Sequence, residues 1–342
     1  MWLRRLVLRL GSNVPSSLEN FDVGYDALST GVAILDRSHM GRVVASGGDA
    51  LDLINRFSTN ETTGLADGDV VVTVLTSPIG RVLELITVVR RSATESILMT
   101  GLGAEDTVVE WLDRYNFGED CNFAVSTATS AQITISGPKA TDLGINLPEP
   151  GRYVTAEIDG VQVEIVAISG PSLASYEVLI DEKSQARNIW DGLVAAGGVP
   201  TNEDTFDVLR VEQGLSARSS EISNEANPLE AGLLPYVDFD KGCYMGQEVI
   251  ARLDTYDKLQ RRLVGLLSES GMALSVDSSL KAGDREVGRI TSAVTSRSLG
   301  RPIAMAYVRK AHTEPGTVLE SVNGPVMVVE LPFAAAVVPG SG

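Results

Sequence analysis

Residues 240–252, with the sequence DKGCYMGQEVIAR, gather several reactive side-chain types within thirteen positions. Cys243 supplies a thiol, and Lys241 stands two residues before it. A nearby ammonium group lowers the pKa of a thiol and so favours the nucleophilic thiolate. Gly242 and Gly246 flank the Cys-Tyr-Met triplet and would let the backbone turn sharply and approach a ligand closely. The spacing predicts a reactive-thiol loop.

The same residues also permit a purely structural interpretation. Cys243 would then be buried, while Gln247 and Glu248 would cap a helix that starts near Val249. The stretch is rich in glycine, aromatic and charged residues and lies just before a change in composition, as functional loops often do. Composition alone leaves both interpretations open.

Length and charge limit the kind of protein. The chain has 342 residues, of which 44% are hydrophobic and 21% are charged, which is typical of two or three folded globular units. Its formal net charge of −17 repels polyanions, so we expect no nucleic-acid partner. That charge is compatible with a local basic pocket for a small anion, for which Arg210, Lys241 and Arg252 are candidates.

Few residues suit metal binding or disulfide formation. Cys121 and Cys243 lie far apart without a CxxC pattern, and His39 and His312 are the only imidazoles. We therefore expect no metal site, no disulfide and no histidine-based catalytic triad.

The N-terminal residues 1–20 interleave arginine with leucine and valine. We interpret them as a peripheral extension, with a targeting segment or a misassigned start as the alternatives. No run of 18 apolar residues occurs, so we expect no membrane span and take the cytoplasm as the default location.

The reactive stretch must be positioned by a mixed α+β framework. Apolar spacing predicts short strands within 31–46, a helix from Asp49, a hairpin at 69–91 and helices at 104–115, 183–198 and 201–214. Thr201 and Asp204 have capping-box spacing at the start of the last helix. Beyond residue 261, short β runs separated by Gly, Pro and Asp predict a separate small β-barrel.

The octapeptide KGCYMGQE at 241–248 resembles the KGCYxGQE signature of the YgfZ family of folate-binding proteins, which are relatives of the glycine-cleavage T-protein (GcvT). Every fixed position of that signature is present. Other segments are similar to landmarks of the wider aminomethyltransferase superfamily in the same order, and the likeness runs from about residue 25 to 320. These segments are RSHMGRVVASGGDAL (37–51), TNETTGLADGD (59–69), LRVEQGL (209–215) and NPLEAGL (227–233).

The resemblance implies a three-domain cloverleaf of the aminomethyltransferase type, with tetrahydrofolate or a one-carbon derivative of it in the central hole. After the extension at 1–20, we expect two interleaved α+β domains within 21–260. One would comprise about 21–52 plus 135–260 and the other 53–134. The C-terminal β-barrel domain would comprise 261–342.

The resemblance also implies roles for particular residues. Glu177 would hold the pterin, because a carboxylate can accept two hydrogen bonds from the aminopyrimidine edge. Arg210 would bind the outer part of the folate, since arginine pairs bidentately with carboxylates. Further folate-binding candidates are Tyr176, Met40, Tyr244, Gln247, Glu248 and Arg252.

The chain departs from the transferase pattern at one important place. Aminomethyltransferases carry a pair of aspartates after a glycine turn, whereas this chain reads GRVLELI at 80–86. Glu84 falls on or beside the catalytic position, and Leu85 replaces one acid. Because small misplacements in acid/base sites are costly, glycine-cleavage activity is not expected.

We therefore expect a YgfZ-like tetrahydrofolate-binding protein that assists the assembly or repair of iron–sulfur proteins, with client proteins as partners. Cys243, Lys241 and Glu84 are the candidate catalytic residues. The alternatives are a tetrahydrofolate-dependent aminomethyltransferase or demethylase, and a folate-binding module without turnover. Whether the protein is an enzyme stays open at this point.

Overall fold

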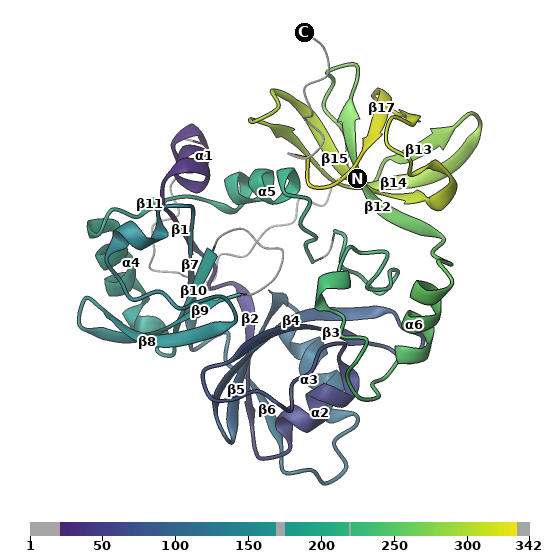
Figure 1. Cartoon of the computed structure of the whole chain (residues 1–342). Helices are drawn as coiled ribbons and strands as arrows, with labels where there is room; N and C mark the ends of the chain where they lie inside the picture. Colours follow the sequence, from purple (N-terminus) through teal and green to yellow (C-terminus); the bar gives the residue numbers. More distant parts are fainter. Residues whose placement is uncertain (1–20, 169–174, 219, 334–342) are drawn as a thin grey trace.

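The computed structural model describes residues 21–168, 175–218 and 220–333 (Figure 1). These residues form two β-sheets with helices and a closed β-barrel, which Figure 1 shows as three lobes. The α+β class and the C-terminal barrel are thereby confirmed. The extension at 1–20 lies outside the described residues.

Sheet A has six strands in the order β11-β1-β7-β10-β9-β8. Their bounds are β1 Ala33–Asp36, β7 Ala131–Ser136, β8 Arg152–Ile158, β9 Val161–Ala167, β10 Ser175–Ile180 and β11 Val199–Pro200. Helix α4 (Ala186–Ala195) packs on one face, where Ile133, Ile165 and Trp190 belong to one buried apolar cluster. That cluster is the core of this lobe.

Sheet B has five strands in the order β3-β4-β5-β2-β6. Their bounds are β2 Met40–Ser46, β3 Val70–Thr76, β4 Val82–Ser92, β5 Glu95–Leu102 and β6 Asn122–Val125. Strands β3 and β4 confirm the hairpin predicted at 69–91. Helices α2 (Ala50–Phe57) and α3 (Glu105–Asp113) cover one face, burying Leu53, Leu98 and Leu112.

The crossings between the sheets differ from the expected domain boundaries. The chain leaves sheet A after Asp36 and enters sheet B at Met40, and it returns between Val125 and Ala131. Strand β2, which we expected in the same unit as β1, pairs instead with β5 and β6. Apolar periodicity identifies a strand without specifying its partner, so these crossings were not evident.

The third lobe is a closed six-stranded barrel in the order β12-β15-β14-β13-β16-β17. Its strands are β12 Arg261–Ser268, β13 Ser279–Ala282, β14 Arg285–Ser296, β15 Arg301–Arg309, β16 Val318–Ser321 and β17 Gly324–Val329. Closure pairs the edge strands with each other, which removes exposed sheet edges.

The other helices lie within or between these lobes. They are α1 Phe21–Thr30, α5 Glu203–Glu212, α6 Gln247–Thr255 and the short 3-10 turns Ala140–Leu143, Lys183–Gln185, Leu234–Tyr236 and Lys310–His312. The N-cap of α5 is Asn202, whose side chain accepts a hydrogen bond from the Thr205 N–H at 2.8 Å. The predicted capping box from Thr201 was wrong by one residue.

Arg42 holds the two sheet crossings together and is only 2% exposed. Its guanidinium donates to the carbonyls of Ser38 and Met40 on the outward crossing. It also donates to the carbonyls of Thr127 and Ser130 on the return crossing. Burial lowers the pKa of Arg42 to about 10. A buried cation is tolerated because these hydrogen bonds replace its hydration.

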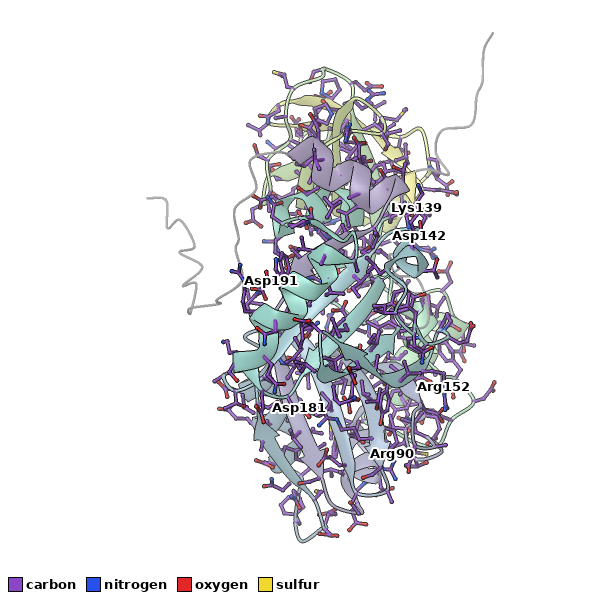
Figure 2. The ribbon with its side chains drawn as sticks, turned by 90° about the vertical axis from the view of Figure 1, so that its left-hand side faces the viewer. Arg90, Lys139, Asp142, Arg152, Asp181 and Asp191 are labelled. Atoms are coloured by element: carbon purple, nitrogen blue, oxygen red, sulfur yellow. The ribbon has the colours of Figure 1, made fainter. Side chains whose placement is uncertain are left out.

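Ion pairs reinforce the junction of sheets A and B nearer the surface. Arg91 on β4 lies 2.9 Å from Glu164 and 2.7 Å from Asp181, both at sheet A strands. Arg152 on β8 pairs with Asp69 beside β3. Figure 2 shows Asp181 and Arg152 at the level where the two sheets meet. An apolar cluster lies between the sheets and includes Val70, Val89, Ile97, Met99, Val166 and Leu179.

We predict that Arg42→Ala destabilises the chain strongly. The substitution leaves four carbonyl oxygens, two of them in fully buried hydrogen bonds, without this donor. Each such loss costs about 1–3 kcal/mol, so calorimetry should show a melting temperature lower by more than about 5 °C. Arg262→Ala is the control, because its pair with Asp257 is exposed and should change the melting temperature by about 1 °C or less. Equal melting of the two variants would contradict the role of Arg42.

Candidate folate site and thiol loop

Glu177 on β10 is a buried carboxylate with one oxygen engaged. The residue is 4% exposed. Its Oε2 accepts hydrogen bonds from Gln132 Nε2 at 2.8 Å and from Thr134 Oγ1 at 2.6 Å. Its Oε1 accepts no hydrogen bond from the residues that the structure describes. A carboxylate oxygen has two acceptor positions, so Oε1 is suited to receive N–H donors of a ligand.

Strand β7 supplies the donors for Glu177 from a polar face. All six residues of β7 are buried, although Gln132, Thr134 and Ser136 are polar. Alternate residues of a strand point to opposite sides of the sheet, so Ile133 and Ile135 enter the apolar core while the polar residues face the other way. These polar residues were not among the candidates expected from the sequence. The pattern that could have identified them is a polar residue at every second position of QITIS.

A second polar cluster lies at the β1–β2 crossing and α5. Arg37 donates to both carboxylate oxygens of Glu203, at 2.9 and 3.1 Å, and its guanidinium lies 4.4 Å from the Phe206 ring centroid. His39 Nε2 lies 3.3 Å from Glu203 Oε1. Burial raises the pKa of Glu203, but Arg37 and His39 outweigh it and lower that pKa to about 2. The charge of Arg37 also interacts with that of Glu177.

Two predicted neighbours of Glu177 take other positions. Tyr176 precedes it in β10, points to the opposite face, and packs against the apolar cluster under α4. Tyr176 is therefore not the aromatic neighbour of the carboxylate. Met40 begins β2, is half-buried, and accepts a hydrogen bond from Arg42 through its carbonyl at 2.8 Å.

Arg210 does not suit its predicted role as ligand to the outer part of folate. It is 7% exposed and donates to Asp207 at 2.7 Å, to the Leu215 carbonyl at 2.7 Å, to Glu221 at 3.1 Å and to Ser292 at 2.9 Å. These bonds occupy its donors. They fasten α5 to the barrel, because Ser292 belongs to β14.

Glu84 is buried in an ion pair. It is 1% exposed, its Oε1 accepts from the Gly101 N–H at 3.4 Å, and its Oε2 pairs with Arg218. The pairing partner comes from the loop that follows α5. A buried carboxylate that faces groups of its own chain is poorly placed to act on a ligand.

Lys241 anchors the thiol loop. Its Nζ donates to Asn55 Oδ1 at 2.7 Å and to the carbonyls of Asn55, Ser58 and Asn60 at 2.8 to 2.9 Å. Burial lowers the pKa of Lys241 to about 8. Because the ammonium is committed to these oxygens, the prediction that Lys241 activates the neighbouring thiol is not supported. Its role is to hold residues 241–246 against the loop after α2.

Cys243 is exposed at the centre of this anchored loop. The loop is fixed on its C-terminal side, where the Met245 N–H donates to the Arg56 carbonyl at 2.9 Å and Thr76 Oγ1 donates to the Met245 carbonyl at 2.6 Å. The alternative of a buried structural cysteine is therefore wrong. Tyr244 is buried, and its hydroxyl has no hydrogen-bond partner among the described residues.

The remaining predicted ligands lie on α6. Gln247 is half-buried, whereas Glu248 and Arg252 are exposed, and neither acid nor amide caps the helix. Figure 1 places α6 beside β3 and β4, on the other side of the molecule from β10. The structure thus separates the predicted site into a carboxylate at Glu177 and a thiol loop at Cys243.

Within 21–168, 175–218 and 220–333, no cluster of His, Cys, Asp and Glu side chains suits a metal ion. No helix in those ranges is both long and apolar enough to cross a membrane.

We predict different effects for the two glycines of the thiol loop. Gly246 has φ +85°, and an added Cβ would lie 2.6 Å from the Ser77 carbonyl oxygen, so Gly246→Ala should cost on the order of 2 kcal/mol or more. Gly242→Ala is the matched control, because its Cβ would meet no atom within 4 Å. Urea unfolding should show almost no change for this control, within about 0.5 kcal/mol. Equal stability of the two variants would show that the turn does not need glycine at 246.

Comparison with known proteins agrees with this architecture. Residues 19–241 match the family model described as the GCVT N-terminal domain, and residues 261–334 match the glycine cleavage T-protein C-terminal barrel domain. A chloroplastic protein of Arabidopsis thaliana, named as a candidate transferase, is 30% identical over 94% of this chain and 76% of its own length. An aminomethyltransferase of Moorella thermoacetica is 29% identical over 88% and 86% of the two chains.

The likeness extends to a solved structure. The glycine cleavage system aminomethyltransferase T of Bartonella henselae superposes with a TM-score of 0.80 at 19% identity, covering 92% of this chain and 89% of that one. This similarity confirms the expected aminomethyltransferase-type fold. With matching family models over both the N-terminal region and the barrel, the chain belongs to the GcvT family.

Proposed function

We propose that this GcvT-family protein binds tetrahydrofolate and assists the assembly or repair of iron–sulfur proteins, in the manner of the YgfZ-type proteins that its KGCYMGQE motif resembles. The observation that carries this proposal is the exposed thiol of Cys243 on an anchored loop. An exposed thiol can reach a client protein, which a buried one cannot.

The residues around Glu177 fit a reduced pterin. The aminopyrimidine edge of tetrahydrofolate presents N–H donors, and Glu177 offers a buried carboxylate whose Oε2 is fixed and whose Oε1 accepts no bond from the described residues. Bound folate would supply a carrier of one-carbon units. Glu177 would orient the pterin, and burial of the site would exclude water that competes for the same hydrogen bonds.

Glu84 favours the assisting role over one-carbon transfer. A transferase needs an acid that can act on the folate, whereas Glu84 is held by Arg218 and the Gly101 N–H. The alternative function is an aminomethyltransferase or demethylase that depends on tetrahydrofolate. This alternative is supported by the relative from Moorella thermoacetica, which is named an aminomethyltransferase and matches over most of both chains.

We predict that the purified chain binds tetrahydrofolate and that Glu177→Gln weakens this binding roughly 10-fold to 100-fold, because hydrogen bonds to a charged acceptor are lost. Anaerobic calorimetric titration measures the effect. Glu164→Gln is the control, since Glu164 lies on the adjacent strand β9 and pairs with Arg91. If the wild-type chain does not bind tetrahydrofolate, the folate part of the proposal fails.

We predict that Cys243→Ser lowers the activity of iron–sulfur enzymes in cells that otherwise lack this protein, while tetrahydrofolate binding is retained. Cys121→Ser is the control, because Cys121 is half-buried against the core of sheet B and should support normal activity. Full complementation by Cys243→Ser would exclude the thiol role. Formation of methylene-tetrahydrofolate from an aminomethyl donor, lost in Glu84→Gln, would establish the transferase alternative instead.

A further inference from the structure

Gln132 lies between two charged groups of the folate site and is 3% exposed. Its Oε1 accepts a hydrogen bond from Arg42 NH1 at 3.4 Å, and its Nε2 donates to Glu177 Oε2 at 2.8 Å. The residue thus connects the cation that joins the two sheet crossings with the carboxylate on β10. No other described side chain bonds to both.

The neighbours fix which way the Gln132 amide points. Arginine has donors and no acceptor, so the amide oxygen must face Arg42. The amide nitrogen must then face Glu177, whose Oε2 accepts its hydrogen. A reversed amide would place its N–H₂ against a guanidinium and its oxygen against a carboxylate, and both contacts are repulsive.

Thr134 completes the arrangement from the same face of β7. Its hydroxyl donates to the same Oε2 at 2.6 Å. Two donors from β7 thus hold Oε2, while Oε1 accepts no bond from the described residues. Ligand recognition therefore depends on donors that do not themselves need to touch the ligand.

We propose that Gln132 is a positioning residue for tetrahydrofolate. Its amide, oriented by Arg42, holds the Glu177 carboxylate turned so that Oε1 receives the aminopyrimidine donors. This inference rests on the proposed folate binding and adds the requirement that residue 132 donate a hydrogen bond. Gln132 acts through two contacts. One crosses from β7 to the paired strand β10, and the other joins it to Arg42 at the sheet crossing.

Other charged groups around this carboxylate enter any measurement against pH. Arg37 interacts with Glu177 directly, and Arg42 reaches it through Gln132. The charged groups that interact in turn with these two arginines are Asp36 on β1, Glu105 on α3, and Glu203 and Asp207 on α5, and His39 lies beside Glu203. All of them are unchanged in a variant of residue 132. The ratio of variant to wild-type affinity at each pH therefore isolates the effect of the substitution, and it also cancels ionisation of the folate.

The decisive variant is Gln132→Glu, tested by anaerobic tetrahydrofolate titration from pH 5 to pH 9. When protonated, the new carboxyl group can donate to Glu177 as the amide does. When ionised, it opposes Glu177 across a hydrogen-bond distance, and the two like charges repel. We expect its affinity relative to wild type to fall roughly ten-fold or more as pH rises across this range.

Three further variants separate positioning from packing. Gln132→Met keeps the size of the side chain but cannot donate, so it should bind tetrahydrofolate roughly ten-fold more weakly at every pH. Thr134→Val should also weaken binding, whereas Thr134→Ser keeps the hydroxyl and should restore most of it. Melting temperatures identify any variant that fails to fold, and the Thr134 pair then carries the test.

The outcomes are distinguishable. If the wild-type chain binds tetrahydrofolate and Gln132→Glu follows the wild-type pH profile, the positioning role is overturned while the proposed folate binding stands. A uniform loss in Gln132→Glu, equal at all pH values to that of Gln132→Met, also overturns it, because packing alone would explain both. Absence of binding by the wild-type chain overturns the folate proposal itself, and this inference with it.

Discussion

The fold and its candidate ligand site both depend on the buried guanidinium of Arg42. The chain leaves sheet A and returns to it through irregular backbone, whose carbonyl oxygens are costly to bury without donors. Arg42 supplies donors to carbonyls on both crossings, and its NH1 also contacts Gln132, which in turn bonds to Glu177. The same side chain thus stabilises the exchange between sheets and orients a carboxylate on the neighbouring strand.

The thiol loop is likewise held by a buried cation that donates to backbone carbonyls. Lys241 supplies one ammonium to the carbonyls of Asn55, Ser58 and Asn60, and Gly246 adopts a left-handed conformation that brings the loop against the β3–β4 turn. In both places a buried cation organises irregular backbone, and the group that could do chemistry is its neighbour. This explains why a lysine next to a cysteine in the sequence does not need to act on the thiol.

The helices and strands were largely predictable from the sequence, whereas the pairing between strands was not. The hairpin of β3 and β4, helix α3 and the barrel follow from local periodicity, which packing did not override. The pairing of β2 with β5 and β6 depends on contacts distant in sequence. At the candidate site, glycine spacing and the motif predicted a loop around Cys243 but left open whether the thiol is buried, and Glu177 was proposed from a family resemblance. The roles predicted for Arg210 and Lys241 were wrong, because the sequence does not show that acceptors elsewhere in the chain already take their hydrogen bonds.

Glu84 is the position at which the proposed function and one-carbon transfer differ most. The fold can be retained while one position is rebuilt, because packing is maintained by many residues and chemistry by few. Here Glu84 is buried beside Arg218 from the loop after α5, and its Oε1 accepts from the Gly101 N–H. Meanwhile Gln132, Thr134 and Glu177 form a buried polar face on strands β7 and β10. Burying polar groups costs free energy unless they are hydrogen-bonded, and the bonds from Gln132 and Thr134 reach only Oε2 of Glu177. Under the proposed function, a ligand would supply the donors for Oε1.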